Sequence, residues 1–242
     1  MEIVTSSDRP DLETQANEVF RVKWPEFTFH DPIAAKYHQR TNKYFSQFDV
    51  FVLDEGRVIA GGWGVPLRWD GTLEDLPDGY DGALVRSIED HESGVAPTTF
   101  SFMAAAVGND VTKRGLAGQV LTALSVRARS AGLAHVIAPL RPTLKHRYPT
   151  TPMKTFVRWT RPDGLSIDPW IRAHQRMGAT ILAPAARSMV ISGTVGQWES
   201  WTDMVFPESG SYVVPNALSL VDINCETDTG TYVEEGLWTE HL

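Results

Sequence analysis

The spacing of apolar residues along this chain of 242 residues predicts a mixture of helices and strands. In residues 10–21 the apolar positions recur at the interval of a helix. Two apolar runs, residues 48–53 and 58–65, flank a turn that ends in Gly56, which predicts a β-hairpin. Residues 26–46 fit neither pattern, so no element is predicted there.

The most informative pattern is an apolar run, residues 100–107, that leads through a glycine-containing loop into a long helical pattern. Where a strand enters a helix in this way, free backbone N–H groups and the positive end of the helix dipole point at one spot. Gly115 and Gly118 lack a Cβ and so let an anion approach the backbone. Lys113 and Arg114 add two cationic side chains beside them. The loop therefore predicts either a phosphate site or a turn whose glycines serve only close packing.

The second half of the chain also alternates between strand and helix patterns. A strand is predicted at residues 135–140, and a short helix follows with Asp168 as its N-cap and Gly178 at its C-terminal end. Further strands are predicted at about residues 188–195, 212–214, 218–223 and 231–237.

The glycine loop resembles the acyl-CoA-binding motif of the GNAT N-acyltransferase superfamily, in which Gln/Arg-x-x-Gly-x-Gly/Ala joins a strand to a helix. Gly115 and Ala117 stand at the second and third fixed positions, whereas Thr112 and Lys113 depart from the usual residues. The order of the predicted elements extends the resemblance over residues 98–140 and 167–195.

The resemblance implies an α/β (α+β) fold of the GNAT type, with a central mixed, mostly antiparallel sheet flanked by helices. Residues 1–195 would form this domain, with insertions at about 68–97 and 141–166 that line an acceptor pocket or are merely surface loops. Residues 196–242 are expected to form a β-rich C-terminal extension packed on the same domain.

The implied activity is acyl transfer, most often of an acetyl group, from CoA to a small-molecule amine that attacks the thioester directly. Acetyl-CoA or another acyl-CoA would be the co-substrate, with no metal. The resemblance implies that a backbone N–H of the strand, near Val107, stabilises the thioester oxygen. The implied CoA-binding residues are Ala105, Val107, Lys113, Arg114, Gly115, Leu116, Ala117 and Gly118.

His174 stands where the family usually has the tyrosine that protonates the departing thiolate, so the resemblance implies a catalytic acid there. His174 also falls on the apolar face of its helix, where it would equally serve as a hydrogen-bonded core histidine. Tyr148 and His146, in the second insertion, are alternative acids or bases. The predicted strand at residues 100–107 contains no carboxylate that could act as the general base.

The net charge of −8 argues against general binding of nucleic acid. The charge is uneven, because residues 70–92 hold eight acidic residues beside a single arginine, whereas residues 141–161 hold six basic residues and no acid. Each run is either a solvated face or a binding feature: the acidic run would attract a cationic amine, and the basic run the phosphates of CoA.

The remaining composition is that of an ordinary globular protein. Cys225 is the only cysteine, which excludes an internal disulfide, and the scattered histidines show no metal-binding spacing. No apolar stretch is long enough to span a membrane, and the first residues do not read as a signal peptide, so a cytoplasmic location is expected. A homodimer is left open.

Two rival functions are compatible with the sequence. The replaced tyrosine and the atypical loop also suit a catalytically inactive GNAT-fold protein that senses acyl-CoA or binds a partner. A GNAT-fold enzyme with altered thioester chemistry, such as decarboxylation or use of a carrier-protein thioester, is the second alternative.

Overall fold

The computed structural model describes residues 1–109, 111 and 115–241. Its described strands form one nine-stranded sheet in the order β1-β2-β3-β4-β5-β9-β8-β7, with β6 pairing to β9 as well. Only β4 and β5 run parallel, and all other pairs are antiparallel. The strands are β1 (Glu2–Thr5), β2 (Asp49–Asp54), β3 (Arg57–Leu67), β4 (Thr99–Val107), β5 (His135–Leu140), β6 (Ala179–Gly193), β7 (Gly210–Tyr212), β8 (Val221–Asn224) and β9 (Thr229–His241).

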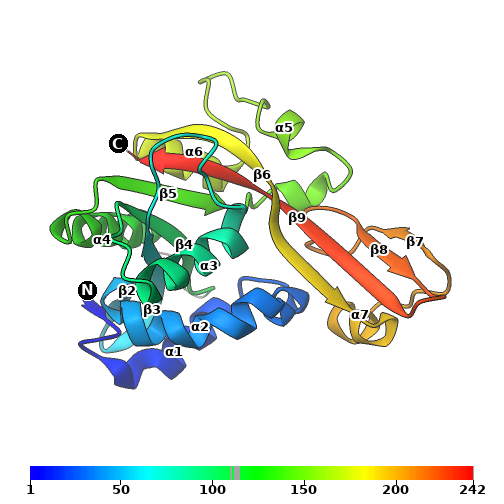
Figure 1. Cartoon of the computed structure of the whole chain (residues 1–242), viewed down its shortest axis with the longest axis horizontal. Coiled ribbons are helices and arrows are strands. Elements are labelled where there is room, and N and C mark those ends of the chain that lie inside the picture. Colours follow the sequence, from blue (N-terminus) through cyan, green and yellow to red (C-terminus); the bar gives the residue numbers. More distant parts are fainter. Residues whose placement is uncertain (110, 112–114, 242) are drawn as a thin grey trace.

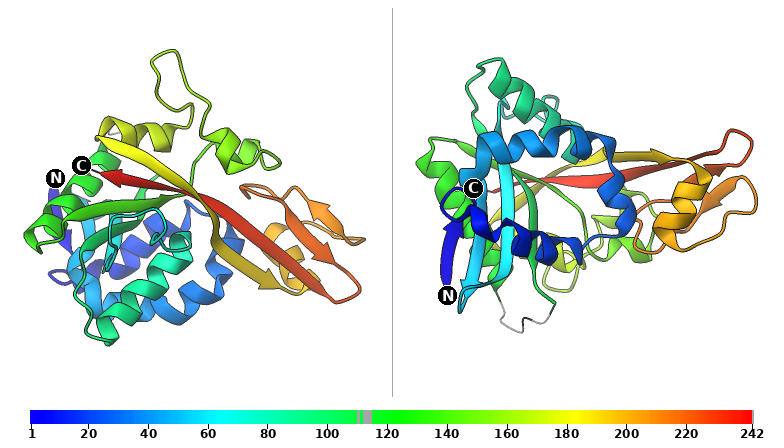
Figure 2. Two further views of the ribbon diagram at one scale, coloured as in Figure 1. Left: turned by 45° about the horizontal axis from the view of Figure 1, so that its top comes forward. Right: turned by 90° about the horizontal axis from the view of Figure 1, so that it is seen from below.

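Helices cover both faces of the sheet (Figures 1 and 2). A Cβ placed on Gly62 would meet Val120 of α4, whereas one on the neighbouring Gly61 would meet Phe20 of α1. Since neighbouring strand residues point to opposite faces, α4 and α1 lie on opposite sides of the sheet. The α-helices are α1 (Glu13–Arg21), α2 (Pro32–Phe45), α3 (Gly79–Glu92), α4 (Leu116–Ser130), α5 (Met153–Phe156), α6 (Pro169–Arg176) and α7 (Val195–Thr202).

The parallel pair β4 and β5 separates after three residues of pairing. Thr99 to Ser101 pair with β5, but the rest of β4 pairs only with β3 among the described residues. Beside the separation, Trp63 faces Ala104 and Gly64 faces Phe102, which leaves Met103 as an extra residue on β4. Such a β-bulge bends its strand. The bend directs the second half of β4 away from β5, which continues against β9.

Several predicted elements are confirmed. The predicted hairpin corresponds to β2 and β3, the long helix to α4, and the strand at residues 135–140 to β5. Asp168 caps α6 by accepting from the N–H groups of Trp170 and Ile171, and Gly178 follows the helix with φ +88°. Residues 26–46, which had no prediction, contain α2, whose N-cap is Asp31.

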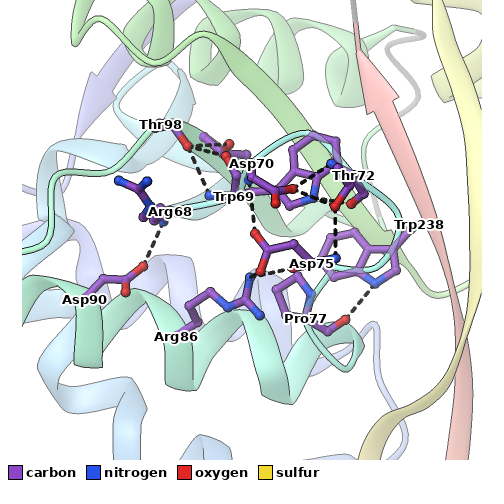
Figure 3. A network of polar contacts seen from close by, with 11 residues as sticks. Arg68, Trp69, Asp70, Thr72, Asp75, Pro77, Arg86, Asp90, Thr98 and Trp238 are labelled. Carbon is purple, nitrogen blue, oxygen red and sulfur yellow. Dashed lines mark hydrogen bonds and ion pairs between the residues drawn. The ribbon is translucent and has the colours of Figure 1, made fainter.

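The first predicted insertion, residues 68–97, is not simply a surface loop, because it contains the helix α3. The segment before α3 is fixed by hydrogen bonds (Figure 3). Thr98 Oγ1 bonds the backbone of Trp69, Arg86 of α3 binds Asp75, and the indole of Trp238 donates to the carbonyl of Pro77. These contacts hold the start of α3 against β9.

The C-terminal part forms an arm that projects from the rest of the molecule (Figure 1). It has its own apolar core, centred on Trp198 and Tyr232, to which Phe27 of the N-terminal half contributes. β6 and β9 pair from Ala179–His241 to Gly193–Gly230 and run through both parts. β9 lies inside the central sheet, between β5 and β6, so the segment after residue 195 contributes a strand to that sheet.

Candidate active site

The N-terminus of α4, at the end of the β4–loop–α4 segment, has the backbone geometry of a candidate anion site. Gly115 is the N-cap with φ +84°, a left-handed conformation that favours glycine, and Leu116 is the first helical residue. A Cβ added at Gly115 or Gly118 would meet no atom within 4 Å. Among the described residues no side chain caps the first-turn N–H groups, so they remain able to bind a phosphate. Lys113 and Arg114, also predicted to bind CoA, lie outside the described residues.

Small side chains line the second half of β4 where it separates from β5. Ala104, Ala105 and Val107 are partly exposed, and Ala106 is buried. On the side that faces β5, the backbone of this half of β4 is not paired to another described strand. A narrow chain of polar amides, such as the pantetheine arm of CoA, fits such a free strand edge. The predicted residues Ala105 and Val107 lie along it.

His174 is fully buried beside this separation and forms a pair with His241 of β9. Its Nδ1 lies 2.8 Å from His241 Nε2, and its ring contacts those of Phe102 and Trp170. Burial, with His241 nearby, lowers the pKa of His174 to about 3, and burial lowers the pKa of His241 to about 4. Both imidazoles are therefore uncharged at neutral pH. His174 Nε2 has no hydrogen-bond partner among the described residues.

A cavity of about 160 Å³ opens beside this pair, between the outer side of α4 and the end of α6. Its walls are Thr122, Ser125, Val126, Arg129, Met177 and His241. His241 thus connects a surface cavity on the α4 side of the sheet with the buried His174.

The two alternative acids lie elsewhere, in the second insertion. Tyr148 is 39% exposed and packs against Phe156 and Trp159 of the same segment. His146 is exposed, and its Nδ1 contacts the carbonyl of Thr143. The contacts of both side chains are with their own segment, and the structure does not bring either of them together with His174.

Part of the basic run in the second insertion serves the fold. Lys145 is buried and donates to the carbonyl oxygens of Tyr148 and Leu218, and burial lowers its pKa. Arg141 forms an ion pair with the buried Glu234 at 2.9 Å. Neither cation is free to bind a phosphate of CoA.

On the opposite face of the sheet, Asp49 and Trp63 lie next to each other on β2 and β3, in register with Ala104 of β4. They line a narrow recess of about 10 Å³ under α2. Burial raises the pKa of Asp49 to about 7, and its Oδ1 is buried without a partner among the described residues. Trp63 also contacts the ring of His38, whose pKa burial lowers. Sequence inspection missed Asp49, because a carboxylate at a strand end has no distinctive pattern.

Known proteins resemble this chain in sequence and in fold. No family model matches the sequence. The sequence is, however, 30% identical over 269 residues to the arginine N-acetyltransferase avaD of Aspergillus versicolor, an alignment that covers 98% of this chain and 92% of that protein. The chain belongs to the GNAT superfamily.

Solved structures agree with the GNAT fold. The loading GNATL domain of CurA from Lyngbya majuscula superposes with a TM-score of 0.62 at 15% identity, covering 99% of this chain and 96% of that one. The GphF GNAT-like decarboxylase in complex with isobutyryl-CoA gives 0.60 at 14% identity, covering 100% and 98%. The predicted fold is confirmed, and the chain is an acyl-CoA-dependent N-acyltransferase of a small-molecule amine.

The described residues hold neither a membrane-spanning helix nor a metal-binding cluster. None of their helices is both long and apolar enough to cross a membrane. They contain no group of three or more His, Cys, Asp or Glu side chains arranged to hold a metal ion.

Proposed function

We propose that this GNAT enzyme transfers the acetyl group of acetyl-CoA to an amine of arginine. The observation that carries the proposal is the 30% identity, along nearly the whole chain, to an arginine N-acetyltransferase. Two structural features support it. The N-terminus of α4 fits the pyrophosphate of CoA, and the edge of β4 where it separates from β5 fits the amides of the pantetheine arm.

In this proposal the N-terminus of α4 binds the pyrophosphate of CoA. Gly115 keeps the approach open, and the N–H groups of Leu116, Ala117 and Gly118 donate to the phosphate oxygens. The free edge of β4 from Ala105 to Val107 pairs with the amides of the pantetheine arm. The backbone N–H groups near the bulge at Met103 then stabilise the negative charge that develops on the thioester oxygen.

The amine must lose a proton as it attacks, and Asp49 is our candidate for accepting it through water. A pKa of about 7 suits a general base near neutral pH. Asp49 lies two strands from Ala104, or about 10 Å at the usual strand spacing, so a direct transfer is excluded.

His174 remains our candidate for stabilising the departing thiolate. Its pKa of about 3 excludes an imidazolium at neutral pH, so the neutral ring would act as a hydrogen-bond donor. If His241 donates to His174 Nδ1, the proton of His174 lies on the unpartnered Nε2. Tyr148 and His146 are the weaker alternatives, since their contacts lie within the insertion.

The direct test combines purified protein, acetyl-CoA and arginine, and follows thiol release together with the mass of the product. Acetylarginine is the expected product, and the variant Gly115→Glu should fold but lose acetyl-CoA binding, because its carboxylate occupies the phosphate position. Thiol release with other amines but not with arginine would contradict the proposed acceptor. Unchanged acetyl-CoA affinity in the folded variant would contradict the assigned phosphate site.

A further inference from the structure

Two carboxylates from distant parts of the chain lie buried together where α2, α3 and β6 meet. Asp31, the N-cap of α2, is 0% exposed, and Asp81, in the first turn of α3, is 9% exposed. Each uses one oxygen for the backbone: Asp31 Oδ1 accepts from Ile33 N at 2.8 Å, and Asp81 Oδ2 accepts from Val190 N at 3.0 Å. The other two oxygens, Asp31 Oδ2 and Asp81 Oδ1, are buried without a partner among the described residues.

The surroundings do not neutralise this pair. Burial, then a side-chain hydrogen bond with Asp31 and the charge of Asp31, raise the pKa of Asp81. The two carboxyl groups are therefore close enough to share a proton, and they would repel each other if both were ionised. The nearby carboxylate of Glu234 adds to this effect, but its own charge is already matched by Arg141 at 2.9 Å. Within the described part of the chain, neither Asp31 nor Asp81 forms an ion pair. Two buried acceptors that face each other need a proton or a cation between them.

The other acidic residues of the run at 70–92 are largely used by the fold. Asp75 binds Arg86, and Asp70 accepts from the backbone and side chain of Thr72 (Figure 3). Glu92 pairs with Arg40. Asp81 differs from these three because it is buried and keeps an unpartnered oxygen.

A continuous row of side chains connects the pair with the place where the acyl group would lie. Ala104, next to the bulge of β4, is in register with Trp63 of β3. The ring of Trp63 contacts that of Tyr80, with centroids 6.3 Å apart, and Tyr80 precedes Asp81. Burial, and after it the charges of Asp31 and Asp81, raise the pKa of the Tyr80 hydroxyl. Both rings are partly exposed.

We infer that Asp31 and Asp81 bind the guanidinium group of the acceptor, with Trp63 and Tyr80 flanking its methylene chain. The inference rests on the proposed function and adds the residues that select the acceptor. A planar guanidinium presents several N–H donors in a fixed fork, so one cation can satisfy both free oxygens. It also matches the charge of the pair, and the amine at the other end of the acceptor then points toward β4.

Asparagine at position 81 separates this role from a purely structural one. If the pair only shares a proton, Asp81→Asn mimics the protonated carboxyl group: its oxygen still accepts from Val190 N and its amide donates to Asp31. If the pair binds a cation, the same variant loses the charge and turns a donor toward the guanidinium. Asp78→Asn, an exposed change of equal charge just before α3, is the matched control.

The experiment measures the steady-state kinetics of wild type, Asp31→Asn, Asp81→Asn and Asp78→Asn with arginine. We expect KM for arginine to rise on the order of 10- to 100-fold in the first two variants. KM for acetyl-CoA should stay the same, and Asp78→Asn should behave as wild type. Citrulline, which lacks the positive charge, should be a poor acceptor for wild type and should lose nothing further in Asp81→Asn.

Calorimetric titration of arginine into each protein without acetyl-CoA keeps this inference separate from the proposed function. If wild type binds arginine and Asp81→Asn does not, the site stands even when arginine is not acetylated. If wild type acetylates arginine and the folded Asp81→Asn variant keeps the same KM and affinity, the carboxylates are a structural pair and the inference is overturned.

Discussion

The two faces of the sheet each bury a pair of ionisable side chains, and the pairs differ in whether they satisfy themselves. On the α4 side, His174 and His241 share a hydrogen bond of 2.8 Å. On the α2 and α3 side, Asp31 and Asp81 each keep a buried oxygen without a partner in the described residues. A neutral imidazole has one donor and one acceptor, so two of them form a chain. Two carboxylates have only acceptors.

This difference decides what each pair needs from outside. The imidazole pair needs no charge, because one uncharged ring can donate to the other, and only His174 Nε2 is left without a partner among the described residues. The carboxylate pair is complete only with a proton or a cation. Two equally buried pairs thus differ in what they require. The histidine pair is stable without charge, whereas the aspartate pair requires a proton or a cation.

The largest effect is expected from Arg141→Met, which removes the cation that pairs with Glu234. Glu234 would be left buried and unpaired, close to Asp81, and breaking such a pair costs about 4 kcal/mol of unfolding free energy. Urea denaturation measures the loss. The double variant Arg141→Met/Glu234→Gln should recover most of it, and Arg9→Met, at an exposed ion pair, should cause no measurable change. If Arg141→Met unfolds at the same urea concentration as wild type, the unpaired carboxylate of Glu234 is tolerated near Asp81, contrary to this prediction.

Acid should reveal the imidazole pair. The pKa of His174 is about 3 in the folded chain, whereas its ordinary value is 6.5. Between these two pH values the unfolded chain binds a proton at His174 and the folded chain does not. Stability is therefore lost as pH falls, by about 3 kcal/mol between pH 7 and pH 4 for this one residue. His174→Gln should flatten the stability curve by that amount in urea denaturation across this range. An equally steep curve in the variant would mean that His174 accepts a proton in the folded protein.

Asp49 offers a single buried carboxylate as a comparison with the pair. Its pKa of about 7 lies above the ordinary 3.8, so the folded chain keeps a proton that the unfolded chain releases, and stability falls as pH rises from 4 to 7. Asp49→Asn should raise the unfolding free energy by about 2 kcal/mol at pH 5.5 and leave it nearly unchanged at pH 4. Thermal unfolding at both pH values checks this. A gain of equal size at pH 4 would assign the effect to something other than charge.

The smallest effect concerns the phosphate site. Gly115→Ala introduces a Cβ into open space but places it on a left-handed residue, which costs about 1 kcal/mol of stability. Acetyl-CoA should still bind with similar affinity in calorimetry, in contrast to Gly115→Glu. A large loss of affinity in the alanine variant would mean that the backbone at this position, rather than open space, decides binding.

The parts of the fold with local patterns were predictable, and those set by distant contacts were not. The apolar run at residues 135–140 gave the strand β5, and the capping residue Asp168 marked the start of α6. The length of β6 was missed because its first half, rich in alanine, becomes a strand only by pairing with β9.

The candidate site divides in the same way. Gly115 and the motif around it were visible in the sequence because the loop, its glycines and the helix are contiguous. Asp31 and Asp81 lie in different elements and meet only through the packing of α2, α3 and β6. Composition left open whether the acidic segment attracts a cationic amine or is a solvated face, and it could not distinguish Asp81 from neighbours engaged by the fold.

β9 follows every other strand in the sequence, yet it occupies the interior of the sheet between β5 and β6 and carries His241. During synthesis on the ribosome, β5 and β6 are made before β9. The edges that pair with β9 stay unpaired until residues 229–241 emerge. Completion of the sheet is thus a late, non-local step. A chaperone that shields exposed strand edges should therefore bind nascent chains that stop before residue 229 and release them once β9 is complete.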